Sequence, residues 1–328
     1  MTGNSTASHA EGKETEYNSL NNSGGIYTST FSIEEIEPYI NWTYFFYAWR
    51  LPSEHAAIAY MHDCPACNAS YIGSFTGIRN SQAKEALRLY HDAKKTLSDF
   101  AAKGYGVKCV FMLAQANSKD EDIIIFNNEG YKTATIPFLR QQTAGEDGYC
   151  LCMSDFILPA DSGKKDKIGI FAVSADKKIT DSEDDSYKDM LNQTLADRLA
   201  EAGAELLHLI VRKDIWAYQP DECLSMKELH NEAFVGIRPA VGYPSMPDIS
   251  INFILDNILD FSRIDVCLTE NGMMTPHASV SGLMISHPRA KYFNVGKISM
   301  EQLNDYSKRR GLPADTMEKY LSANLLKV

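Results

Sequence analysis

The sequence predicts a protein of the α+β class. Segments with helical periodicity and segments with strand composition alternate along the 328 residues, but without the regular rhythm of strand-helix-strand units. Hydrophobic side chains make up 44% of the chain, which is enough for a sizeable core. No internal repeat is apparent, so we expect a single folded domain over residues 31–328.

The first 30 residues are rich in Ser, Thr, Asn, Gly and Glu and contain almost no aliphatic side chains. Such a segment cannot bury enough apolar surface to order itself, so we predict a disordered polar tail over residues 1–30. Order is expected from Phe31 onward. The aromatic run at 42–49 is predicted to lie in the core.

A helix is predicted between an N-cap at Ser81 and a stop near Gly104, because apolar side chains recur there at helical spacing. Strands are expected at 108–114, 123–126 and 168–173. A long helix follows over about 187–212. Its apolar stripe consists of Leu191, Leu195, Leu199, Ala202, Leu206 and Ile210.

The last third of the chain is predicted to begin with a short helix, opened by a capping box of Ser225 and Glu228. A further helix is expected at 251–259, with strands at 279–285 and 292–298. Two terminal helices complete the chain. The first of them is capped by Ser299 and Gln302 and ended by Gly311.

The charge balance excludes several classes of partner. With 32 basic and 43 acidic side chains the net charge is −11, whereas a nucleic-acid scaffold needs a concentrated basic surface. No apolar stretch is long enough for a membrane span, and the N-terminus lacks the features of a signal peptide. We therefore expect a cytoplasmic protein without nucleic-acid or membrane partners.

Seven cysteines, an odd number without export signals, favour reduced thiols over a disulfide framework. Cys64-x-x-Cys67 with nearby His62 suggests a metal site, which Cys150 and Cys152 would complete as a four-thiolate set. The second pair has the wrong spacing and lies far along the chain. We therefore interpret these residues as structural or free thiols and assign no metal.

Two prolines, a glycine, an arginine and a tyrosine fall within the nine residues 236–244. Pro239 and Pro244 prevent a helix or central strand from running through, and Gly242 lets a ligand approach the backbone closely. Arg238 can bind a carboxylate with two hydrogen bonds, and Tyr243 can cover an apolar or planar surface. The segment is therefore either a ligand-binding loop or a structural turn anchored by Arg238.

Acidic side chains recur every four residues on the long helix, at Asp197, Glu201 and Glu205, with His208 following. Periodicity alone favours a solvated acidic face, because like charges at this spacing repel. The alternative is a row of carboxylates that faces a cationic ligand or the imidazole of a partner.

Several runs occur in a fixed order along the chain, at 40–43, 139–143, 195–202, 236–244, 278–282, 286–288, 291–296 and 309–311. In this order they resemble the activation domain of vitamin B12-dependent methionine synthase. The resemblance covers nearly the whole chain after the first few dozen residues. It implies a single curved domain with a mainly antiparallel twisted sheet and flanking helices.

The resemblance also implies a binding site for S-adenosylmethionine. Arg238 would bind the carboxylate of the ligand, and Tyr243 and Asp197 would face the cobalamin. The residues implied to bind S-adenosylmethionine are Asn41, Glu201, Glu232, Arg238, Ala240, Gly242, Tyr292 and Phe293. Without the family, strand packing would account for the two aromatic residues, and an exposed helix end for Glu232.

Two departures from the family pattern bear on this site. Asn41 stands where the family has an aspartate before the Trp-Thr pair, so a charge-assisted hydrogen bond becomes a neutral one and we expect weaker binding. Residues 274–277 replace a Trp-Pro-Gly turn, which alters the surface expected to face cobalamin. We interpret His277 as a turn residue.

The resemblance implies a free-standing reactivation subunit that acts in trans and is not active alone. Cob(II)alamin on a partner methionine synthase chain would be methylated with S-adenosylmethionine as methyl donor and a flavodoxin-type protein as electron donor. No catalytic acid or base is assigned. The alternatives are a noncatalytic docking module for a corrinoid protein, or reactivation of another corrinoid methyltransferase.

Overall fold

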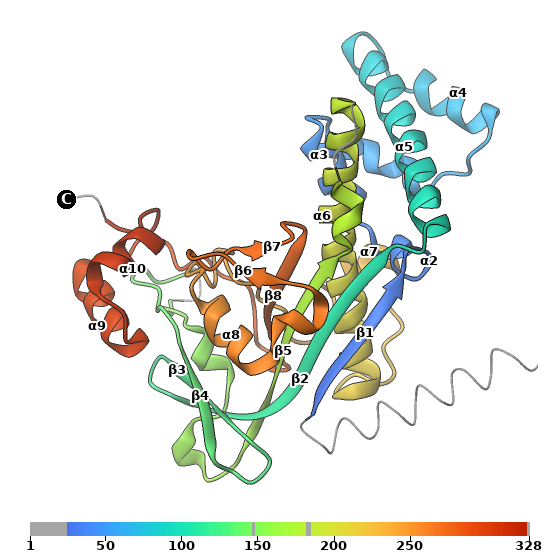
Figure 1. Cartoon of the computed structure of the whole chain (residues 1–328). Coiled ribbons are helices and arrows are strands. Elements are labelled where there is room, and N and C mark those ends of the chain that lie inside the picture. The colour runs from blue at the N-terminus through green and yellow to red at the C-terminus, as the bar shows by residue number, and fades with distance from the viewer. Residues whose placement is uncertain (1–24, 146–147, 182–184, 327–328) are drawn as a thin grey trace, which may run out of the picture.

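The long strand β2 is the centre of the fold in the computed structural model, which describes residues 25–145, 148–181 and 185–326 (Figure 1). The strands are β1 Ile26–Ser32, β2 Gly106–Lys119, β3 Asp122–Phe126, β4 Lys132–Pro137, β5 Asp166–Ala175, β6 Cys267–Leu268, β7 Met274–Thr275 and β8 Ser279–Met284. The α-helices are α2 Ile33–Ile36, α3 Trp42–Ala48, α4 Pro65–Gly73, α5 Ile78–Ala102, α6 Ser186–Ile210, α7 Met226–His230, α8 Ile251–Leu259, α9 Met300–Arg310 and α10 Ala314–Tyr320.

The main sheet has the order β4-β3-β2-β5-β8, and every pair in it is antiparallel. β1 pairs with the first half of β2 and β3 with the second half, so these two strands share one edge of β2. The predicted α+β class with a mainly antiparallel sheet is confirmed. None of the helices in the described ranges combines the length and the apolar character that crossing a membrane requires.

Side chains of β2 alternate between two cores, as the two-residue period of a strand requires. Val107, Cys109 and Phe111 pack in the core shared with α5 and α6. Val110 and Ala114 face the opposite core, which includes α8. Because both faces of the sheet are covered, β2 is buried along almost its whole length.

α6 lies directly on the sheet. A Cβ atom on Gly203 would be 2.6 Å from Cγ1 of Val107 and 3.2 Å from Cγ1 of Val173, so only a glycine allows this close approach. The predicted stripe of α6 is buried at its first four positions, but Leu206 and Ile210 are only half-buried and Leu207 is buried instead. The α-helix ends at Ile210 and continues as a π-helical turn.

Several predicted elements are confirmed with small changes in their bounds. α8 spans the predicted residues, and the capping box of Ser225 and Glu228 opens α7. Ser299 caps α9, but the side chain of Gln302 donates to the carbonyl of Arg140 at 3.0 Å rather than closing a capping box. Gly311 ends α9 in a left-handed conformation.

Three other expectations are wrong. Residues 26–30, expected to belong to the disordered tail over 1–30, form part of β1, which pairs with β2; the part of that tail over 1–24 lies outside the described residues. α5 begins at Ile78 after Gly77, so Ser81 is not its cap. The aromatic run at 42–49 is only partly core, since it also includes the exposed tyrosines Tyr44 and Tyr47.

The strand expected at 292–298 is also wrong, since this segment makes only one isolated bridge, at Ile298. The outer edge of β8 is occupied by residues 237–241. They approach so closely that a Cβ on Gly282 would lie 2.2 Å from the carbonyl oxygen of Pro239. Since that edge is taken, residues 292–298 have no strand to pair with there.

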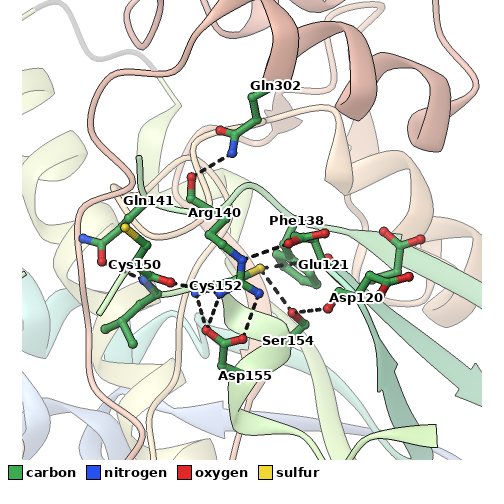
Figure 2. A network of polar contacts seen from close by, with 12 residues as sticks. Asp120, Glu121, Phe138, Arg140, Gln141, Cys150, Cys152, Ser154, Asp155 and Gln302 are labelled. Atoms are coloured by element: carbon green, nitrogen blue, oxygen red, sulfur yellow. Dashed lines mark hydrogen bonds and ion pairs between the residues drawn. The ribbon is translucent and has the colours of Figure 1, made fainter. Parts of the chain in front are cut away.

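Arg140 joins the turn after β2 to the segment that precedes β5 (Figure 2). Its guanidinium donates to both carboxylate oxygens of Asp155 at 2.8 and 2.9 Å and to Glu121 at 2.9 Å. Nη1 also donates to the carbonyl of Cys150 at 2.9 Å. The run at 139–143 that carries part of the family resemblance therefore has a structural role.

Replacing Arg140 with methionine removes these hydrogen bonds but keeps much of the side-chain volume. We expect Arg140→Met to lower the free energy of unfolding by about 2 kcal/mol, because two partly solvated carboxylates lose their charged donor. Urea denaturation measures the change. Arg88→Met, which removes an exposed pair with Glu85, is the matched control and should change stability by less than about 0.5 kcal/mol. Equal losses in both variants would contradict the role given to Arg140.

Candidate functional site

A cavity of about 800 Å³ lies where α6, the start of α3, the loop between α7 and α8 and the segment at 292–294 meet. Eight of the predicted site residues line it: Asn41, Glu201, Glu232, Arg238, Ala240, Tyr243, Tyr292 and Phe293. Its size falls in the range of small-molecule sites. The structure therefore brings together residues from four separate regions of the sequence.

The loop at 236–244 reaches the cavity by following the outer edge of β8. Leu283 donates its N–H to the carbonyl of Pro239 at 3.0 Å, and Val241 donates to the carbonyl of Ser281 at 2.9 Å. Because partners in an antiparallel ladder alternate, the backbone groups of Ala240 face away from β8. The proline-containing loop is thus held by a sheet edge, where proline is tolerated.

Arg238 is the central cation of the cavity. Its Nη2 donates to Glu205 at 2.9 Å, while its backbone N–H donates to the hydroxyl of Tyr292 at 2.9 Å. Its Nε is buried and makes no hydrogen bond within the described residues. Burial opposes the charge, but Glu205, Tyr292 and Glu201 raise the pKa of Arg238, so the guanidinium stays charged.

Glu205 corrects the interpretation of the acidic row as a solvated face. Its side chain is only 11% exposed, and Oε1 lies 4.0 Å from Nη1 of Arg212, which is itself fully buried. Arg212 donates twice to Glu222, at 2.7 and 2.8 Å. Glu205 therefore belongs to a buried set of paired charges, which periodicity alone could not reveal because Arg238 and Glu222 come from other segments.

Glu201 and Glu232 provide the negative charge of the cavity. Glu201 accepts a hydrogen bond of 2.6 Å from the hydroxyl of Tyr243, and burial followed by the charge of Glu201 raises the pKa of this tyrosine. Glu232 has a φ of 57°, which holds it in the left-handed conformation just after α7. Burial raises the pKa of Glu232, although Arg238 acts in the opposite direction.

Asn41 lies at the start of α3 and caps that helix. Its Oδ1 accepts the backbone N–H of Thr43 at 3.1 Å. The other polar atom of the amide is then a donor, whereas an aspartate at this position would cap the helix and still offer a second, negatively charged oxygen. The structure thus gives a geometric reason why Asn41 alters the cavity.

Two predicted residues are absent from the cavity wall. The N–H of Gly242 donates to the carbonyl of Met246 at 2.8 Å, which closes the turn with a φ of 88°. Asp197 accepts from Gln193 at 3.1 Å and lies 3.6 Å from Nδ1 of His277. His277 thus contacts the acidic row from the altered 274–277 segment.

Sequence reasoning missed several residues of the wall. Tyr39, Tyr44, Arg198, Leu229, His230, Ser245, Val280 and Asn294 also line it. Arg198 lies 5.8 Å above the ring of Tyr44, a cation-π contact that joins α6 to α3. No local pattern marks these residues, because each faces the cavity only after the helices have packed.

Comparisons with known proteins identify the family. A family model for the vitamin B12 dependent methionine synthase activation domain matches residues 32–311. The chain belongs to this family. A crystal structure of the MetH reactivation domain bound to AdoHcy is 35% identical to this activation domain, with a TM-score of 0.82; the match covers 93% of this chain and 92% of that one. Methionine synthase is a cobalamin-dependent methyltransferase, so the activation domain implies a cobalamin-binding partner.

His208 of the activation domain makes a pH-dependent contribution to stability. Burial, followed by the charges of Arg212 and Arg238, holds its pKa well below the usual 6.5. In the unfolded chain His208 takes up a proton near that pH, but in the folded chain it does not. Stability should therefore fall below about pH 6.5, by up to about 1.4 kcal/mol per pH unit.

The variant His208→Gln should remove this component, so the difference in unfolding free energy between wild type and variant should change between about pH 7 and about pH 5. Urea denaturation at several pH values measures it. A pH-independent difference for His208→Gln would show that the buried imidazole is not the source.

Proposed function

We propose that the cavity binds S-adenosylmethionine and that the domain presents its methyl group to cob(II)alamin on a methionine synthase. The observation that carries the proposal is the charged Arg238, held by Glu205 in the wall of a cavity of about 800 Å³. The AdoHcy-bound relative supports it, since AdoHcy is the product left when S-adenosylmethionine gives up its methyl group.

The charges of the cavity match those of the ligand. A carboxylate would accept hydrogen bonds from Arg238, and the ammonium and sulfonium groups would lie near Glu201 and Glu232. Tyr292 and Phe293 would provide apolar surface for the adenine. Site residues here bind and orient, since the difficult chemistry belongs to the cobalt cofactor, which accepts the methyl group once it is reduced.

Arg238→Gln tests the proposal. Loss of the charged donor should weaken S-adenosylmethionine binding by about 10- to 150-fold, as measured by calorimetry. The double variant Arg238→Gln/Glu205→Gln removes both charges of the pair, so it leaves no unpaired buried carboxylate at Glu205. It therefore tests binding in a chain that is less prone to unfold than the single variant. The exposed Arg263→Gln is the matched control. Unchanged affinity in the folded Arg238 variants would refute the assigned site.

Asn41→Asp should tighten binding of S-adenosylmethionine by about 5- to 30-fold, which corresponds to about 1–2 kcal/mol. The new carboxylate keeps the cap on Thr43 and adds a charged acceptor at the wall of the cavity. Asn257→Asp adds the same charge on the exposed side of α8 and should leave affinity unchanged. Calorimetry showing equal or weaker binding by Asn41→Asp would remove the role given to Asn41.

We further propose that the corrinoid is supplied in trans. The 328 residues contain no Asp-x-His-x-x-Gly cobalamin motif, so the corrinoid must be carried by other residues. Mixing the protein with a methionine synthase lacking its own activation domain, a flavodoxin-type reductant and S-adenosylmethionine should restore methylcobalamin, detected by its absorption spectrum. Saturable ligand binding without methylcobalamin would instead favour a docking role or another corrinoid client.

A further inference from the structure

Three metal-ligating side chains converge at the start of α4, outside the cavity. His62, Cys64 and Cys67 each offer one ligand atom, and these three atoms lie within 4.8 Å of one another. Among the described residues this is the only such group of three His, Cys, Asp or Glu side chains. Neither cysteine forms a disulfide. The folded chain thus places an imidazole beside two sulfurs. The spacing of the two cysteines in the sequence does not show that His62 joins them.

Local backbone geometry produces this arrangement. Cys64 is the N-cap of α4, with φ of −143° and ψ of 159°, and its sulfur accepts the N–H of Cys67 at 3.4 Å. The Cys-x-x-Cys turn therefore places both sulfurs at the first turn of the helix.

Asp63 stands between these residues but is already engaged. Its Oδ1 accepts hydrogen bonds from Asn68 at 3.0 Å and from His91 at 3.2 Å. The group therefore supplies three protein ligands, and the fourth position of a tetrahedral centre is left for water or another small ligand.

We propose that His62, Cys64 and Cys67 bind one thiophilic divalent cation, with zinc as the preferred ion. Two thiolates and an imidazole form a donor set that suits zinc, whereas magnesium and calcium require oxygen ligands. This proposal is independent of the proposed S-adenosylmethionine site, since none of the three residues lines that cavity.

The cation would fasten a weakly packed part of the fold. α4 contains no buried residue, and it contacts the core through the half-buried Tyr71 and Ile72. Tyr71 also lies 2.5 Å from Nδ1 of His55, whose 3-10 segment, Ser53–Tyr60, precedes the turn. A metal that joins the turn to the first turn of α4 would restrict the motion of both.

The test uses the full chain without an affinity tag, reduced and then freed of metal with a chelator. Titration with Co²⁺ alone should give thiolate-to-cobalt absorption that saturates at one ion per chain, and Zn²⁺ should displace it. Cys64→Ser and Cys67→Ser should abolish the signal, and His62→Gln should weaken binding at least about tenfold. The exposed Cys223→Ser and Cys267→Ser are matched controls that should bind as wild type does.

Zinc should also slow amide hydrogen exchange in α4 in the wild-type chain but not in Cys64→Ser. The metal site would be refuted if the reduced chain takes up no stoichiometric ion, or if the signal survives in Cys64→Ser. A Cys64–Cys67 pair that forms a disulfide and, after reduction, still binds no metal would also refute it. Zinc binding without any change in exchange would overturn the fastening role.

Discussion

The pairing of Glu205 with arginines from other segments is the constraint on which the cavity depends. A buried carboxylate without a partner is strongly unfavourable, so α6 can pack with Glu205 inside only if cations meet it there. Arg238 comes from the loop along β8, and Arg212 comes from the turn that follows α6. The charge requirement therefore fixes the loop against the helix and brings the two sides of the cavity together.

The same pairing prepares the cavity for an anion. Glu205 accepts a hydrogen bond from one Nη of Arg238, and the backbone of Arg238 donates to Tyr292, so the guanidinium is already positioned. A ligand carboxylate would then meet a fixed donor rather than a mobile side chain. Little conformational entropy is lost on binding when the receptor group is ordered beforehand.

Packing of α6 on the sheet offsets the unfavourable free energy of burying charged side chains on this helix. β2 buries side chains on both faces, and Gly203 lets the backbone of α6 lie directly on Val107. The apolar contacts of α6 with this sheet supply the favourable free energy of packing, while Glu201 and Glu205 on the same helix line the cavity. α4, by contrast, has no buried side chain, so its position depends more on polar contacts.

The sequence by itself determined the elements whose signals are local. The apolar stripe identified α6, the capping box identified α7, and the resemblance of ordered runs identified eight residues of the cavity wall. The stripe and the capping box depend only on residues that are close together in the sequence. The resemblance depends on several runs that occur in the family's order. These predictions can therefore be made without knowing which other segments pack against the element.

Only the tertiary structure decided which groups meet. It buried Glu205, left residues 292–298 without a strand partner, turned the N–H of Gly242 to Met246, and set His62 beside two sulfurs. For Glu205 and for 292–298, the outcome depends on which sheet edge is occupied and which charge lies opposite. Arg238 lies 33 residues along the chain from Glu205, and residues 237–241 lie dozens of residues before 292–298, so no local pattern encodes these contacts. For Gly242 and His62, the outcome depends on side-chain and turn geometry that spacing leaves open.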